Sequence, residues 1–138
     1  MKSKSKNKTR VVIDTNVLVS ALWSKHNRVT EILTLVINDA LLVCYDAAIM
    51  QEYQDVLSRP NLAFRFEESR VNEIINKIKT DGLAVAVKPS KIILADESDR
   101  IFYDVAKSCN AYLITANIKH YPNERFIINP FDFIKLPD

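Results

Sequence analysis

Short apolar runs alternate with helix-like segments along almost the whole chain, and this alternation restricts the possible folds more than any other feature. Each run is only three or four residues long, whereas the segments between the runs place apolar residues at helical spacing. Strands that alternate with helices predict an α/β domain with a mostly parallel sheet. The expected strands are 10–13, 41–44, 85–87, 112–115 and 126–128, and the expected helices are 16–23, 28–37, 47–57 (capped by Asp46), 67–80 and 98–108, with a terminal turn at 131–134.

The bulk properties fit one globular domain of ordinary composition. The chain has 138 residues, of which 48% are hydrophobic and 26% are charged, enough for a single core. Gly82 is the only glycine, which excludes a P-loop and a G-x-G-x-x-G loop because both need several glycines. Cys44 and Cys109 lie in apolar stretches, so we expect two buried free thiols in a reduced, cytoplasmic protein.

The N-terminal segment differs in charge from the rest of the chain. Five of the 19 basic residues lie in it, at Lys2, Lys4, Lys6, Lys8 and Arg10. We expect residues 1–9 to be a flexible basic tail and residues 10–138 to be a single, mildly acidic domain. The tail is either a solvated end or an arm that follows nucleic-acid phosphates. We expect no export signal and no membrane span, because Asp14 and Asn16 interrupt the apolar run that follows.

Three carboxylates are expected to face the folded interior. Asp14 ends the first apolar strand, and Glu52 and Asp99 share helix faces with apolar neighbours. A carboxylate aimed into a core is costly unless positive charge meets it. A strand end, a helix face and a helix start can converge at the carboxyl edge of a parallel sheet, where ligands bind. Such a cluster indicates Mg²⁺ or Mn²⁺ and the hydrolysis of phosphodiester bonds.

Each of these acids also has a simpler explanation. Asp14 alone is compatible with an N-cap, Glu52 with a boundary residue that reaches water, and Asp99 with an acid at a helix start. Asp96, just upstream of Asp99, is either an N-terminal cap or a fourth carboxylate facing the same site.

Three segments carry these acids, namely RVVIDTNVLVSALW, DAAIMQEYQDVLSRP and DESDRIFYDVAKSCNAYLITANIKHYP, and together they resemble the PIN-domain ribonucleases. The opening strand and helix of that family resemble RVVIDTNVLVSALW, and its glutamate-bearing helix resembles DAAIMQEYQDVLSRP. Its third-acid helix, with a strand that ends in a Thr-x-Asp or Thr-x-Asn turn, resembles DESDRIFYDVAKSCNAYLITANIKHYP. The resemblance spans about residues 10–133, and the most similar members are bacterial proteins described as toxins of toxin–antitoxin pairs.

The resemblance implies a three-layer α/β/α sandwich, Mg²⁺ or Mn²⁺ at the acid cluster, and endonucleolytic cleavage of RNA. Asp14, Glu52 and Asp99 match the first three acids of the family. Asp14 and Asp99 would bind the metal, and Glu52 would bind it or orient the attacking water. Hydrogen bonds that support the site would come from Thr15, Asn16 and Thr115. The family further implies a homodimer and, for toxins, a co-expressed antitoxin protein.

Asn117 departs from the family pattern. Many PIN domains have a fourth acid at this position, after the threonine of the last motif. A neutral amide oxygen keeps the geometry and loses one charge, which should weaken a second metal site, and Asp96 could compensate for the loss.

Basic residues near the last motif are candidates for substrate binding. We expect Arg100, Lys119 and His120 at the rim of the site. Lys119, His120 and Tyr121 follow the last motif directly and would meet phosphate and stack a base unless they form an ordinary polar loop. Further candidates for the rim are Lys25, His26 and Arg28. Apolar residues around the Pro60 break are either core or a patch for a second copy or an antitoxin, namely Leu57, Leu62, Phe64 and Phe66.

The acids therefore favour a metal-dependent hydrolase of phosphodiesters, and the resemblance implies that it is a ribonuclease and a toxin. The alternative is a module that binds RNA or an antitoxin and has weakened catalysis, which Asn117 favours. A phosphatase or phosphate receiver on a similar sheet is disfavoured, because Lys119 is displaced from the strand end where a receiver would need a lysine.

Overall fold

Five parallel strands form the sheet at the centre of the molecule. The computed structural model describes residues 8–23, 27–63 and 66–137. The strands are β1 (Thr9–Ile13), β2 (Leu41–Tyr45), β3 (Leu83–Ala84), β4 (Tyr112–Ile114) and β5 (Ile127–Ile128). Their order across the sheet is β3-β2-β1-β4-β5, and every neighbouring pair is parallel. The carboxyl ends of all five strands therefore lie at the same edge.

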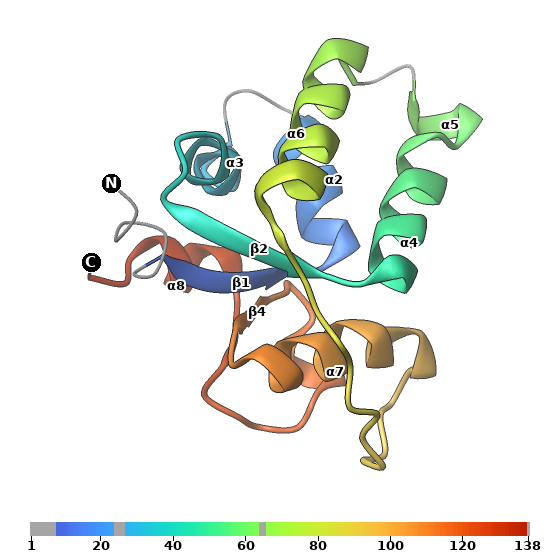
Figure 1. Ribbon diagram of the computed structural model, residues 1–138, viewed down its shortest axis with the longest axis vertical. Coiled ribbons are helices and arrows are strands. Elements are labelled where there is room, and N and C mark those ends of the chain that lie inside the picture. Colours follow the sequence, from blue (N-terminus) through green and yellow to red (C-terminus); the bar gives the residue numbers. More distant parts are fainter. Residues whose placement is uncertain (1–7, 24–26, 64–65, 138) are drawn as a thin grey trace.

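Helices cover both faces of this sheet. They are α2 (Thr15–Trp23), α3 (Thr30–Ile37), α4 (Ala47–Leu57), α5 (Pro60–Ala63), α6 (Glu68–Asp81), α7 (Arg100–Cys109) and α8 (Pro130–Ile134), with the 3-10 turns η1 (Glu97–Asp99) and η2 (Ile118–His120). Figure 1 shows α2, α3, α4 and α6 on one side of the sheet and α7 on the other. This arrangement confirms the predicted α/β/α fold with a parallel sheet.

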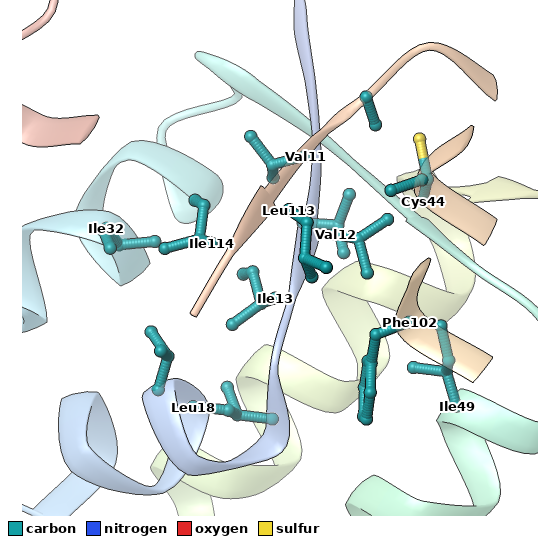
Figure 2. Packing of buried hydrophobic residues seen from close by; sticks show 14 of the residues in the cluster. Val11, Val12, Ile13, Leu18, Ile32, Cys44, Ile49, Phe102, Leu113 and Ile114 are labelled. Atoms are coloured by element: carbon teal, nitrogen blue, oxygen red, sulfur yellow. The ribbon is translucent and has the colours of Figure 1, made fainter. Parts of the chain in front are cut away.

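The neighbouring strands β1 and β4 end at the same level of the sheet. Val11, Val12 and Ile13 of β1 are at most 1% exposed, because side chains from both helical layers pack on them. Figure 2 shows these residues among their apolar neighbours from β4, α4 and α7. Ile13 pairs with Ile114 of β4, and the N–H of the next residue, Asp14, donates to the Ile114 carbonyl at 3.0 Å. This register places the residues that follow β1 and β4 side by side.

The strand predicted at 85–87 is wrong. β3 consists of Leu83–Ala84 and pairs with Cys44 and Tyr45, the last two residues of β2. β2 cannot extend the ladder further, because Asp46 follows it and caps α4 by accepting a hydrogen bond from the Ile49 N–H at 2.9 Å. Residues 85–95, which we call the strap, therefore leave the sheet and cross α7.

A polar stripe on α7 holds the strap. Arg100, Asp104 and Ser108 are four residues apart and so share one helix face. The Ser108 hydroxyl accepts from the Lys88 N–H at 2.9 Å, and the Asp104 carboxylate accepts from the Ser90 N–H at 3.3 Å. The Arg100 guanidinium donates to the Ser90 carbonyl at 3.0 Å. Since the strap runs directly into η1, this stripe helps to place the start of α7.

Other boundaries differ slightly from the prediction. α3 begins at Thr30 rather than at residue 28, and α5 is a helix that the sequence pattern does not predict, although proline suits its first turn. β1 begins at Thr9, and the preceding Lys8 forms an ion pair with Asp39 at 2.6 Å. The rest of the basic tail, residues 1–7, lies outside the described residues.

The apolar and sulfur-containing residues singled out in the sequence are mostly part of the core. Cys44 and Cys109 are both buried and free, as predicted. Leu57 is buried and Phe66 packs against the core, whereas Phe64 lies outside the described residues. In the described part of the chain, no helix combines the length and the apolar character needed to cross a bilayer.

Candidate active site

A cleft of about 380 Å³ opens at the carboxyl edge of the sheet and brings together most of the predicted site residues. It is lined by Asp14, Thr15, Asn16, Glu52, Val56, Arg59, Asp96, Ser98, Asp99, Phe102, Asn117 and His120. These residues come from the end of β1, from α2, α4 and α7, and from the two 3-10 turns. Thr115 is fully buried behind the cleft.

Asp14 lies at the bottom of this cleft and is only 5% exposed. Its backbone carbonyl accepts from the N–H groups of Val17 and Leu18, so α2 begins on the main chain of Asp14. Its side chain instead accepts a hydrogen bond from the Thr115 hydroxyl at 2.7 Å. Burial raises the pKa of Asp14, the Thr115 hydrogen bond opposes this, and the charge of Asp99 adds to the rise. Asp14 is therefore a buried acid held in one orientation.

Glu52 reaches the cleft from α4. The Thr15 hydroxyl donates to Glu52 Oε2 at 2.7 Å, which fixes the carboxylate against the start of α2. The next residue, Tyr53, is fully buried and donates its hydroxyl to the Ile13 carbonyl at 2.5 Å. Because Tyr53 ties α4 to the end of β1, Glu52 is held beside Asp14. Burial, followed by the charge of Asp14, raises the pKa of Tyr53, which keeps it a hydrogen-bond donor.

Asp99 ends η1 at the entrance of α7, and its side chain is 16% exposed. Its Oδ2 atom is buried, and no described residue donates a well-formed hydrogen bond to it. His120 Nδ1 lies 3.3 Å from this oxygen. Burial raises the pKa of Asp99 and the charge of Asp96 raises it further, whereas the neighbouring His120 and Tyr121 oppose the rise. This oxygen therefore has unused capacity to accept a cation.

Asp96 acts as a cap and also lines the cleft. Its Oδ1 atom accepts from the Ser98 N–H at 2.9 Å and from the Ser98 hydroxyl at 2.8 Å. These hydrogen bonds hold the pKa of Asp96 below its usual range. The two interpretations of Asp96, as a cap and as a carboxylate facing the site, are therefore compatible with each other.

Asn117 joins the network around Asp14 through its main chain. Its N–H donates to the Thr115 hydroxyl oxygen at 3.0 Å, and that hydroxyl in turn donates to Asp14. The Asn117 residue lines the cleft. A neutral side chain therefore stands where the family often has an acid.

Of the basic residues predicted at the rim, His120 lines the cleft and Arg100 and Lys119 do not. Arg100 uses its guanidinium on Glu97, on Ser90 and, at 2.6 Å, on the carbonyl of Ile92. Its N–H groups are thus hydrogen-bonded to η1 and to the strap. Arg28 is paired with Glu31 at 3.6 Å. Lys25 and His26 lie outside the described residues.

Arg59 lines the cleft and does not appear among the sequence candidates. It lies seven residues after Glu52 with Val56 between them, which is helical spacing in the sequence, although the structure ends α4 two residues before Arg59. This spacing is the signal that identifies it, and it becomes informative once Glu52 is assigned to the site. Tyr121, which follows Lys119 and His120 in the sequence, has a buried hydroxyl beside Asp99, and burial followed by the charge of Asp14 raises the pKa of Tyr121.

The donor set fits a hard divalent cation, although the described carboxylates do not form a closed ligand cage. Nowhere in the described ranges do three acidic, histidine or cysteine side chains lie close enough together to chelate an ion as they stand. The cleft nevertheless contains Asp14, Glu52 and Asp99, whose oxygens are the ligands Mg²⁺ and Mn²⁺ prefer. The buried, unbonded Oδ2 of Asp99 and the mutual repulsion of Asp14 and Asp99 both favour a cation here.

Comparison with known proteins agrees with this geometry. The uncharacterized archaeal protein MJ1680 of Methanocaldococcus jannaschii is 27% identical over 118 residues, which cover 85% of this chain and 76% of the relative. No solved structure matches the chain. The PIN domain matches residues 10–119, a range that includes Asp14, Glu52 and Asp99. The chain therefore belongs to the PIN domain family.

Proposed function

We propose that this protein is an endoribonuclease that uses Mg²⁺ or Mn²⁺ to hydrolyse RNA phosphodiester bonds. Membership of the PIN domain family indicates nuclease-type activity in general. The observation that supports the more specific proposal is the cleft in which Asp14, Glu52 and Asp99 meet, although they come from distant parts of the sequence. Carboxylates gathered at one sheet edge suit metal-assisted phosphoryl chemistry.

The residues of the cleft would have different roles in metal binding and catalysis. Asp14, oriented by Thr115, and Asp99, whose buried Oδ2 lacks a well-formed hydrogen bond, would hold the metal. Glu52 would bind the metal or orient the attacking water, since Thr15 holds one of its carboxylate oxygens and leaves the other. A bound Mg²⁺ or Mn²⁺ would polarise a phosphoryl oxygen and lower the pKa of a water molecule.

An RNA cleavage assay tests this proposal. A mixed pool of structured and single-stranded RNAs, and in parallel a DNA pool, is incubated with the protein in Mn²⁺, Mg²⁺ or EDTA. The Asp14→Asn variant should lose cleavage, whereas Asp55→Asn should retain it. Asp55 is a suitable control because it lies on the same helix as Glu52, is exposed, and accepts a hydrogen bond from Gln51. Metal-dependent cleavage of RNA by the wild type and by Asp55→Asn supports the proposal. Equal cleavage by Asp14→Asn would contradict it.

A second candidate is a module that binds RNA or a protein partner and has weak catalysis. The neutral Asn117 in the cleft favours it, because one fewer charge weakens metal binding. This candidate predicts that Mn²⁺ raises the melting temperature of the wild type without any RNA cleavage. Restored cleavage in Asn117→Asp would then identify the missing charge as the cause.

A finer proposal is that the nuclease is the toxin of a toxin–antitoxin pair and acts as a homodimer in the cytoplasm. Its support is the resemblance to bacterial PIN toxins. Induced expression in a bacterial host tests the toxin role, with wild type and Asp14→Asn compared at equal protein levels. Growth arrest by the wild type alone supports it, and normal growth with both would count against it. The mass of the purified protein in solution tests the dimer.

A further inference from the structure

Two arginines lie next to the acidic cleft, and they differ in whether their guanidinium groups are already used. Arg100 donates hydrogen bonds to Glu97, Ser90 and Ile92. Arg59, in contrast, forms no side-chain hydrogen bond or ion pair with any other described residue, although it lines the cleft. Within the described residues, Arg59 is therefore the permanently charged cation that this cleft offers to an anionic ligand.

The backbone of Arg59 is firmly held even though its side chain is exposed. Its N–H donates to the Val56 carbonyl at 3.2 Å, which continues the last turn of α4. Its carbonyl accepts from the Leu62 N–H at 2.9 Å and so begins α5. The following Pro60 further restricts the backbone conformation. A guanidinium attached to a rigid backbone segment loses less conformational entropy on binding than one attached to a mobile loop.

The position of Arg59 relative to the acids determines which phosphate it can reach. Glu52 lies in the middle of α4, whereas Arg59 lies two residues beyond the last residue of that helix, next to the start of α5. Val56 lies between them and also lines the cleft. Arg59 thus lies along the cleft from Glu52, beyond the end of α4, and this position suits a contact with a neighbouring phosphate rather than with the one being cleaved.

We propose that Arg59 binds a backbone phosphate adjacent to the scissile one, so that the RNA strand runs along α4 from Glu52 towards α5. This inference depends on the proposed ribonuclease function. A guanidinium forms bidentate, charge-assisted hydrogen bonds to phosphate. Phosphate contacts position a strand without reading its sequence. Arg59 is therefore a substrate-positioning residue, and it should affect KM and the salt dependence of binding rather than the chemical step.

Steady-state kinetics test the proposed phosphate contact. Cleavage of one RNA substrate is measured between about 50 and 200 mM KCl for the wild type, Arg59→Ala, Arg59→Lys and Arg125→Ala. Arg125→Ala is the matched control, because Arg125 is exposed and lies before β5, away from the carboxyl edge. Arg59→Ala should raise KM about tenfold with kcat within about twofold, since one charge-assisted contact is lost. The slope of log(kcat/KM) against log[salt] should become shallower by about 0.7–1. Arg59→Lys should restore the slope and part of the KM.

Two results would overturn the inference while the ribonuclease proposal stands. One is cleavage by Arg59→Ala with the KM and salt slope of the wild type. The other is tighter Mn²⁺ binding by Arg59→Ala with an unchanged salt slope, which would mean that Arg59 only offsets the charge of the acids. If the wild type cleaves no RNA under any metal condition, the proposed function fails and the inference fails with it.

Discussion

At the scale of single residues, Asp14 shows the conflict between stability and function most clearly. It is 5% exposed, and burial and the nearby Asp99 both raise its pKa. A carboxyl whose pKa is raised by folding binds protons more tightly in the native state than in the unfolded state. Its contribution to stability therefore decreases as the pH rises above the ordinary carboxyl range. Without metal, Asp14 should destabilise the protein at neutral pH.

We predict that Asp14→Asn stabilises the metal-free protein at pH 7 by about 0.5–2 kcal/mol, as other substitutions of strained functional residues do. The asparagine removes the buried charge and can still accept the Thr115 hydrogen bond. The gain over the wild type should shrink as the pH falls towards about 4, where the wild-type carboxyl is protonated. Urea unfolding of both proteins in EDTA, between about pH 4 and pH 7, measures this difference in the free energy of unfolding. A variant less stable than the wild type at pH 7 would contradict the prediction, and Asp55→Asn should change stability by less than about 0.5 kcal/mol.

Sequence reasoning identified the acids of the cleft more successfully than its basic residues. Asp14, Glu52 and Asp99 were predictable because a charge in an apolar pattern is unusual and can be recognised locally. The position of Arg100 depends on the carbonyls of Ser90 and Ile92, which approach it only after the strap has crossed α7. No local pattern contains that information. Arg59 was recognisable only from its spacing to Glu52.

At the scale of elements, the link between α6 and the sheet depends on the one glycine of the chain. Gly82 has an ordinary φ of −76°, so it is not needed for an unusual backbone conformation. A Cβ atom there would lie 2.4 Å from the Ile78 carbonyl oxygen and 2.7 Å from that of Val43. Both obstacles are backbone atoms, so close approach of α6 to β2 explains the glycine.

We predict that Gly82→Ala lowers the free energy of unfolding by roughly 1–3 kcal/mol, as overpacking typically does. The backbone of α6 or β2 would have to move to relieve the clash. Asn110→Gly is a useful control, because Asn110 has φ 56° at the end of α7, where glycine is readily accommodated. Chemical denaturation of both variants measures the difference. Equal stability of Gly82→Ala and the wild type would show that the close approach is relieved at no cost.

The strap is the element that the sequence pattern failed to predict correctly. Apolar residues at 85–87 suggested a strand, but β2 ends at Tyr45, so the ladder stops at the Val85 N–H, which donates to the Tyr45 carbonyl at 2.8 Å. Tertiary context therefore overrides a local β preference. The strap instead follows the polar stripe of α7 into η1, so its attachment helps to fix Asp99.

We predict that Arg100→Ala destabilises the fold, because it removes charge-assisted hydrogen bonds to the strap. It should also weaken Mn²⁺ binding about tenfold, as the loss of groups that support metal ligands usually does. Arg28→Ala is the control, since Arg28 is 60% exposed and forms one surface ion pair. Calorimetric titration of folded protein separates the two effects. Unchanged Mn²⁺ affinity in Arg100→Ala would show that the strap does not position Asp99.

At the scale of the whole molecule, the parallel sheet explains how distant acids meet. The chain returns to the same sheet edge after β1 and again after β4, and α4 and α7 begin near that edge on opposite sides of the sheet (Figure 1). The alternation of strands and helices was sufficient to predict this architecture. The details of the cleft, such as the orphaned Oδ2 of Asp99, depend on packing that alternation does not specify.

The central claim is that this edge holds a divalent cation through Asp14 and Asp99. Titration of Mn²⁺ into the folded protein, followed by electron paramagnetic resonance of the free ion, tests it most directly. Wild type and Asp55→Asn should bind Mn²⁺ with the same affinity, whereas Asp14→Asn and Asp99→Asn should each bind at least about tenfold more weakly. Equal Mn²⁺ binding by all four proteins, or no binding by the folded wild type, would contradict the claim.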